Sequence, residues 1–216
     1  MSNEDADRTP SSEETEDRRS DFPRYRPVMD PPGQFAEFVE TMRTLQDLAV
    51  SVDAPDDVIS SALEQAKSLV DVLRPYEARE GLSPAGRLPV LPGFGSLLLP
   101  PFVTEHFGPD GVRLRGEFRR YHLGGNAAAH GGVLPLLFDL VYGMVIFAAK
   151  RPISRTAYLH VNYRKVTPLH TPLVIEGSID RTEGRKTFVT ARLTTPDGTL
   201  LADGDGLMVQ LLPGQP

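Results

Sequence analysis

An aspartate inside an apolar helix is the residue of this sequence best suited to chemistry. Residues 133–149 are apolar on every face apart from Asp139, so a helix over this range should be buried on all sides. A carboxylate placed there needs a partner or a cleft, because desolvation disfavours its charged form. Desolvation also raises the pKa of a carboxyl group, which suits a general base. This favours a functional Asp139, and a structural Asp139 that caps a nearby backbone group is the alternative.

A glycine-rich segment leads into this helix and gives the second chemical signal. Residues 122–132 read HLGGNAAAHGG, and His130 precedes Asp139 by nine residues. The first N–H groups of a helix have no partner within the helix, and Gly131 and Gly132 would let a ligand approach them because they lack a Cβ. Such a helix entrance can bind an anion or stabilise an oxyanion. A glycine pair that only forms a tight turn is the alternative.

Other common chemistries have no support in the sequence. The five histidines show no metal-ligand spacing, and there is neither a G-x-S-x-G elbow nor a P-loop. The lack of cysteine excludes disulfides, thiolate metal sites and a cysteine nucleophile. A net charge of −6 argues against nucleic acid as a partner. We therefore expect no metal, no cofactor and no bound nucleic acid.

The apolar run 133–149 must also be considered as a membrane span. Its length is at the lower limit for spanning, and it contains Pro135, Asp139 and Gly143. An aspartate at a bilayer centre costs about 2.5–3.5 kcal/mol even on an insertion scale. Strand patterns flank the run on both sides, so we expect a central helix of a folded domain and no membrane insertion. The N-terminus has no apolar signal-peptide core, which predicts a cytoplasmic location.

Alternating apolar and polar residues predict strands around this helix. A half-buried strand over 112–118 follows the turn Pro109-Asp110-Gly111, which pairs it with residues 100–107. Further strands are expected at 157–163, 173–180, 187–193 and about 207–212. One strand pair, one long helix and a meander of about four strands form an α+β pattern with an antiparallel sheet.

Three segments precede this main domain, which we place at 95–213. Residues 1–27 are acidic and have too few apolar residues to offset the entropy of ordering, so they are predicted to be a disordered tail. Residues 28–75 show two amphipathic patterns typical of a helical hairpin, packed against the main domain or a partner subunit. Residues 76–94 are rich in proline and glycine and form a connector.

Three stretches of the main domain resemble a known family. Residues 130–139, HGGVLPLLFD, look like the signature of hotdog-fold acyl-CoA thioesterases of the PaaI type. Residues 156–163 resemble the strand that follows the hotdog helix, and residues 183–186 the next hairpin. The resemblance covers about residues 95–212. It implies a hotdog fold, in which an antiparallel sheet wraps around a long central helix, and hydrolysis of acyl-CoA without a metal. Coenzyme A then enters only as part of the substrate.

The resemblance also implies catalytic roles. Gly131 matches the glycine whose N–H polarises the thioester carbonyl. Asp139 matches the acid that acts as general base or nucleophile, and Thr156 matches the residue that orients water. In the family these groups come from two subunits, which implies a homodimer or a dimer of dimers. His130 is expected to orient the loop and the start of the helix, or to be a hydrogen-bonded loop residue.

One position departs from the family pattern. The family often has an asparagine six residues before the histidine, where it assists the carbonyl. This sequence has Gly124 there, and the nearest asparagine is Asn126. Either Asn126 reaches the same point or the second oxyanion donor is lost.

Substrate contacts are predicted from charge and apolarity. The phosphates of coenzyme A need cations, and basic side chains at the ends of strands are candidates, although they could equally be ordinary solvated surface residues. The acyl chain needs an apolar tunnel beside the helix, and its candidates could equally be core. The cationic candidates are Arg164, Lys165, Arg185 and Lys186, the tunnel candidates are Phe138, Tyr142 and Ile146, and Gly132 is the candidate backbone contact.

Two other functions were weighed against hydrolysis. A catalytically weak acyl-CoA-binding or regulatory module would keep the fold and use the helical hairpin for partners, and Gly124 is its main support. A hotdog hydratase would need an Asp/His pair acting on an enoyl group, and no loop shows the required histidine downstream of an aspartate.

Overall fold

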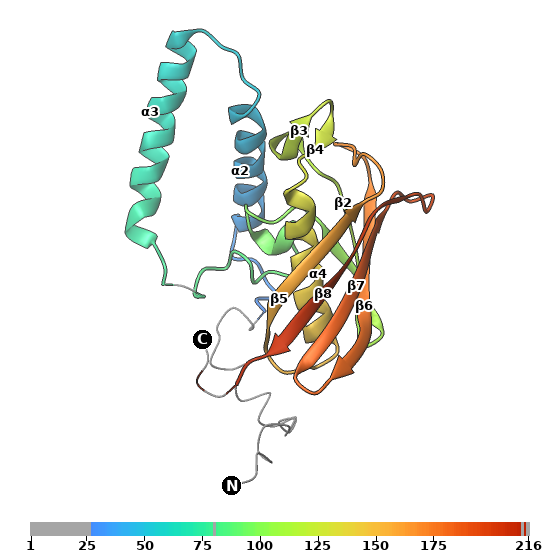
Figure 1. Ribbon diagram of the computed structural model, residues 1–216. Helices are drawn as coiled ribbons and strands as arrows, with labels where there is room; N and C mark the ends of the chain where they lie inside the picture. Colours follow the sequence, from blue (N-terminus) through green and yellow to red (C-terminus); the bar gives the residue numbers. More distant parts are fainter. Residues whose placement is uncertain (1–26, 80, 213, 215–216) are drawn as a thin grey trace.

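A six-stranded antiparallel sheet curves around one long helix in the computed structural model, which describes residues 27–79, 81–212 and 214 (Figure 1). The helix is α4 (Val133–Ala148). The strand order is β1-β2-β6-β7-β8-β5, which places β1 and β5 at the two edges. The strands are β1 (Val103–Gly108), β2 (Gly111–Gly116), β5 (Ser154–Tyr163), β6 (Leu173–Glu183), β7 (Lys186–Thr194) and β8 (Leu200–Gln210). The predicted α+β hotdog architecture is therefore confirmed.

Local sequence explains two features of the strands. A two-residue turn with Gly184 at φ 53° joins β6 to β7, as tight hairpins favour. Strand β8 begins at Leu200, and the predicted start near residue 207 is therefore wrong. Residues 202–206 have low strand propensity, which hides the first half of this strand from the sequence pattern. Packing explains its glycines: a Cβ on Gly206 would lie 2.6 Å from Cε2 of Tyr142. The missing side chain at Gly206 thus lets strand β8 approach the ring of Tyr142 on the helix.

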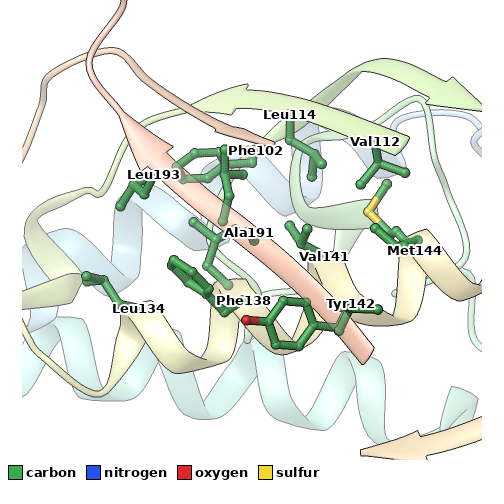
Figure 2. Close-up of a cluster of buried hydrophobic side chains, with 14 of the residues drawn as sticks. Phe102, Val112, Leu114, Leu134, Phe138, Val141, Tyr142, Met144, Ala191 and Leu193 are labelled. Atoms are coloured by element: carbon green, nitrogen blue, oxygen red, sulfur yellow. The ribbon is translucent and has the colours of Figure 1, made fainter. Parts of the chain in front are cut away.

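The core lies between the sheet and one face of α4. Phe138, Val141 and Tyr142 of α4 are fully buried and lie beside strand residues such as Leu114 and Leu193 (Figure 2). The opposite face is open: Asp139 and Gly143 are exposed within the chain. The expectation that α4 is buried on all sides is therefore wrong for this face, because the sheet covers only one side of the helix.

The two N-terminal helices differ in how they meet the main domain. α2 (Phe35–Ala49) is bound through Arg119, whose guanidinium lies 2.7 Å from Asp47 and 2.5 Å from Glu40. α3 (Asp56–Leu73) buries none of its residues within the chain and stands beyond α2, away from the sheet (Figure 1). The prediction that the helical hairpin packs against the main domain is therefore met by α2 and not by α3. Apart from Pro27, the predicted disordered tail lies outside the described residues.

Arg43 of α2 holds the connector in place. Its side chain is 4% exposed and donates hydrogen bonds to the carbonyl oxygens of Leu99 (3.3 Å), Pro92 (3.0 Å) and Ser96 (2.6 Å). Burial lowers the pKa of Arg43, while the carboxylates of Glu40 and Asp47 act in the opposite direction. Among the described residues from 74 to 95, the regular structure consists of the short helical turns η3 (Arg74–Tyr76) and η4 (Pro92–Gly95), as the proline and glycine content of the connector predicts.

Candidate active site

The structure brings Asp139 and Thr156 together. The Thr156 hydroxyl donates a hydrogen bond of 2.6 Å to Oδ1 of Asp139, from strand β5 to the open face of α4. A shift of register between Thr156 and Tyr158 accompanies this contact in the pairing of β5 with β8. Within the described residues, Oδ2 of Asp139 has no hydrogen-bond partner. The carboxylate is therefore oriented through one oxygen and presents the other.

A cavity of about 940 Å³ opens beside this pair. Asp139, Leu140, Gly143 and Phe147 of α4 form one side, and apolar side chains make up most of its wall. Its volume is at the upper end of the range of roughly 300–1,000 Å³ that is typical of small-molecule sites. Asp139 is exposed at this cavity, so the strong desolvation predicted from the sequence is not present within one chain.

Two of the predicted tunnel residues lie in the core instead. Phe138 and Tyr142 are fully buried on the sheet face of α4, and only Ile146 of the three candidates also borders the cavity. The hydroxyl of Tyr142 is buried without a hydrogen-bond partner among the described residues. Burial, followed by the nearby carboxylate of Asp205, raises the pKa of Tyr142. The helix period explains the correction, since residues 138 and 142 share a face that residues 139 and 143 do not.

The entrance to α4 is organised by His130. Its Nδ1 accepts a hydrogen bond of 3.0 Å from the N–H of Gly132, and its carbonyl accepts one of 3.0 Å from the N–H of Val133. The hydroxyl of Tyr163 donates to the carbonyl oxygen of Gly131 at 2.8 Å. Within the described part of the chain, the N–H of Gly131 has no partner. The loop therefore uses the Gly132 N–H internally and presents the Gly131 N–H.

Gly131 and Asp139 of one chain lie at different heights along the axis of α4. Asp139 follows the helix N-cap, Gly132, by seven positions. At a rise of about 1.5 Å per residue, this places them about 10 Å apart along the helix axis. The two groups of one chain therefore lie about two helical turns apart.

The structure accounts for the glycine at position 124. A Cβ on Gly124 would lie 2.6 Å from Cα of His130, so an asparagine there would require the loop to shift. Asn126 lies at the tip of the hairpin formed by β3 (Leu123–Gly125) and β4 (Ala128–Ala129), with φ 49°. Asparagine tolerates this left-handed conformation better than most residues, which gives Asn126 a conformational role.

The predicted cations lie at opposite ends of the sheet. Arg164 follows the last residue of β5 and pairs with Asp203 at 2.7 Å, and Lys165 is its exposed neighbour. Arg185 is in the β6–β7 turn, where it donates to the carbonyl of Gln210 at 2.8 Å, and Lys186 is exposed beside it. In one chain, these two pairs cannot bind the same phosphate group.

Three arginines that sequence reasoning missed line the cavity, namely Arg87, Arg151 and Arg155. Arg155 directly precedes Thr156, and Arg151 follows the end of α4, so proximity to the predicted site could have indicated both. Arg87 belongs to the connector, and its position depends on the fold of that segment.

Two negative findings concern the described residues 27–79, 81–212 and 214. No helix among them combines the length and the apolarity needed to cross a membrane. They also contain no group of three or more histidine, aspartate or glutamate side chains placed to hold a metal ion.

Sequence comparison relates the main domain to acyl-CoA thioesterases. Residues 126–202 match the family model of the Thioesterase superfamily. Acyl-coenzyme A thioesterase THEM4 of Rattus norvegicus is 33% identical over 88 residues, which cover 40% of this chain and 37% of that protein. THEM4 of Bos taurus is 32% identical over 85 residues, or 39% of this chain and 34% of that protein. The chain thus matches little more than a third of the length of these relatives.

Structural comparison supports the same fold over a longer range. A crystal structure of a thioesterase superfamily protein superimposes with a TM-score of 0.73 at 24% sequence identity, covering 85% of this chain and 100% of that one. Residues from 95 onward are little more than half of the sequence, so the shared fold includes part of the N-terminal extension, by which we mean the residues before 95. The chain therefore contains a domain with the hotdog fold, and Gly131, Asp139 and Thr156 all lie within residues 126–202, which match the Thioesterase superfamily model.

Proposed function

We propose that this protein hydrolyses acyl-CoA thioesters to a free acid and coenzyme A. The observation that carries the proposal is the 2.6 Å hydrogen bond from Thr156 to Asp139, at the mouth of a mostly apolar cavity of about 940 Å³. An oriented carboxylate with one available oxygen, next to space for an acyl group, suits attack on a thioester carbonyl. The similarity to enzymes named acyl-coenzyme A thioesterase supports this substrate class.

In this mechanism, Asp139 activates the attack and Thr156 orients it. The carboxylate of Asp139 takes a proton from water, whose oxygen bonds to the thioester carbon, or attacks that carbon directly. In the first route the C–S bond breaks, the sulfur takes the proton held by Asp139 and leaves as coenzyme A thiol, and the acid is released. In the second route the C–S bond breaks to leave a mixed anhydride on Asp139, and water then hydrolyses this anhydride, supplying the hydroxyl group of the acid and the proton of the thiol. No metal is needed for these steps, so we expect turnover to continue in the presence of a chelator.

The developing oxyanion is stabilised by the Gly131 N–H of a second copy of the chain. The separation of about 10 Å along the helix axis within one chain, from the helical rise, supports the use of Gly131 from a second copy. Strand β5 carries Thr156 at an edge of the sheet, and residues 155–158 are exposed. An open edge strand favours pairing with another strand, which supports a homodimer, alone or within a dimer of dimers.

One observation favours weak catalysis as the second candidate function. Gly124 stands where the family often has an asparagine, and the close approach of His130 leaves no space for a side chain. Loss of one oxyanion donor typically costs about 10²–10³-fold in turnover. A protein that binds acyl-CoA and turns it over slowly would result.

The test is thiol release from short, long and aromatic acyl-CoAs. Because the protein has no cysteine, every thiol detected comes from the substrate. Asp139→Asn should lower kcat/KM about 10²–10⁴-fold, the usual range for loss of a general base. Asp180→Asn removes a carboxylate from an exposed ion pair with Arg181 and serves as the matched control. Equal activity of Asp139→Asn and wild type would refute the mechanism, and retention of acyl-CoA without turnover in wild type would favour the binding module.

A further inference from the structure

The cavity beside Asp139 has one wall that lies outside the matched domain. Met29, Pro89 and Phe94 border it and precede residue 95, where the main domain begins, and Leu99 borders it at the start of that domain. They face the same space as Gly143 and Phe147 of α4. The N-terminal extension of this chain is therefore part of the site that holds Asp139.

This wall is held firmly. The guanidinium of Arg43 binds three carbonyl groups of the segment 92–99, which fixes its path beside α4. Phe94 has a left-handed backbone (φ 56°), and its carbonyl accepts hydrogen bonds from the N–H groups of Gly86 (2.9 Å) and Leu88 (3.3 Å). A non-glycine residue adopts this conformation only where its surroundings impose it. The fold therefore maintains Phe94 and Leu99 at the cavity.

Gly143 leaves open space on the opposite wall. It follows Asp139 by one helical turn on the same face and lies in the middle of α4, where glycine is unfavourable relative to alanine. A Cβ on Gly143 would meet no atom of the described residues within 4 Å outside its own helical turn, and its φ is not left-handed. Neither backbone conformation nor packing within the chain explains a glycine here. Its effect is to widen the cavity next to the carboxylate.

We propose that this cavity binds an aliphatic acyl chain, and that Leu99 and Gly143 set the chain length that the protein accepts. The inference rests on the proposed thioesterase function and assigns two residues that set its chain-length specificity. The apolar wall favours methylene groups over charged ones. Burial of one CH₂ corresponds to about a fourfold gain in binding.

The experiment measures kcat/KM for a series of straight-chain acyl-CoAs from acetyl to palmitoyl. For wild type, kcat/KM should rise by up to about fourfold per methylene until the cavity is filled. Leu99→Trp and Gly143→Leu should end this rise at a shorter chain. Leu98→Trp is the matched control, because Leu98 is 69% exposed and lies outside the cavity wall formed by the described residues. Its chain-length profile should match that of wild type.

A second readout separates this inference from the proposed activity. Kd values for non-hydrolysable thioether analogues of the same series report chain length without turnover. If wild type hydrolyses nothing but its Kd falls with chain length, and Leu99→Trp shortens that dependence, the hydrolase proposal fails and the cavity assignment stands. A wild-type profile that does not depend on length would overturn the assignment. So would a Leu99→Trp profile lowered equally at all lengths, or a Gly143→Leu variant that changes oligomeric state in light scattering.

Discussion

The two faces of α4 have opposite roles although their composition is similar. On the sheet face, Phe138, Val141 and Tyr142 are fully buried against the strands. On the cavity face, Leu140 and Phe147 are half-buried, and Asp139 and Gly143 are exposed. The sheet face stabilises the domain, whereas the cavity face supplies the proposed chemistry. Burial decides between these roles, because an apolar residue contributes to stability in proportion to the area it removes from water.

The largest expected contrast uses one phenylalanine from each face. Phe138→Ala should lower the free energy of unfolding by about 3–5 kcal/mol, the usual range for truncating a buried phenylalanine. Phe147 is half-buried and packs on Phe107 with ring centroids 6.0 Å apart, so Phe147→Ala should cost clearly less. Urea denaturation of both variants at one protein concentration measures the difference. Equal losses would contradict the division of α4 into two faces.

The next contrast concerns activity on the cavity face. Thr156→Val removes the hydroxyl that binds Asp139 and keeps the shape of the side chain. A hydrogen bond to a charged group is worth about 1.5–3 kcal/mol, so kcat/KM should fall about 10- to 100-fold, and the free energy of unfolding should fall by no more than this amount. Thr156→Ser restores the hydroxyl and should recover most of the activity. Failure of serine to do so would show that the threonine methyl group, and not the hydrogen bond, matters.

The sequence predicts the main elements of the fold and the contact between Asp139 and Thr156, but not which face of α4 packs on the sheet. The strands, the span of α4 and the contact between Asp139 and Thr156 follow from alternation, periodicity and the family resemblance. An all-apolar helix gives no amphipathic direction, so the sequence could not show that Phe138 and Tyr142 face the sheet. The cavity wall formed by Phe94 and Leu99 is not predicted either. The path of this segment depends on Arg43, which lies 49 or more residues before the carbonyl groups that it binds.

Gly206, which lies against the sheet face of α4, and Gly143, on its cavity face, should respond oppositely to an added methyl group. A Cβ on Gly206 would lie 2.6 Å from the ring of Tyr142, so Gly206→Ala should lower the free energy of unfolding by about 1–3 kcal/mol through overpacking. Gly143→Ala adds a methyl group in open space within a helix and should raise it by up to about 1 kcal/mol. Urea denaturation compares both variants with wild type. A loss of stability in Gly143→Ala would mean that another chain occupies the space beside Gly143.

The smallest expected effect is at the hydroxyl of Tyr142, on the sheet face. This buried oxygen has no hydrogen-bond partner among the described residues, so Tyr142→Phe should leave the free energy of unfolding unchanged or raise it by up to about 1 kcal/mol. Burial raises the pKa of Tyr142 above the ordinary value of 10.0. The unfolded tyrosine therefore ionises first as the pH rises through 10, and the folded protein loses stability at this group, while below pH 10 the contribution is constant. Urea denaturation at several pH values should thus show an advantage of Tyr142→Phe that grows above pH 10. An advantage that does not change with pH would mean that the hydroxyl reaches solvent when it ionises.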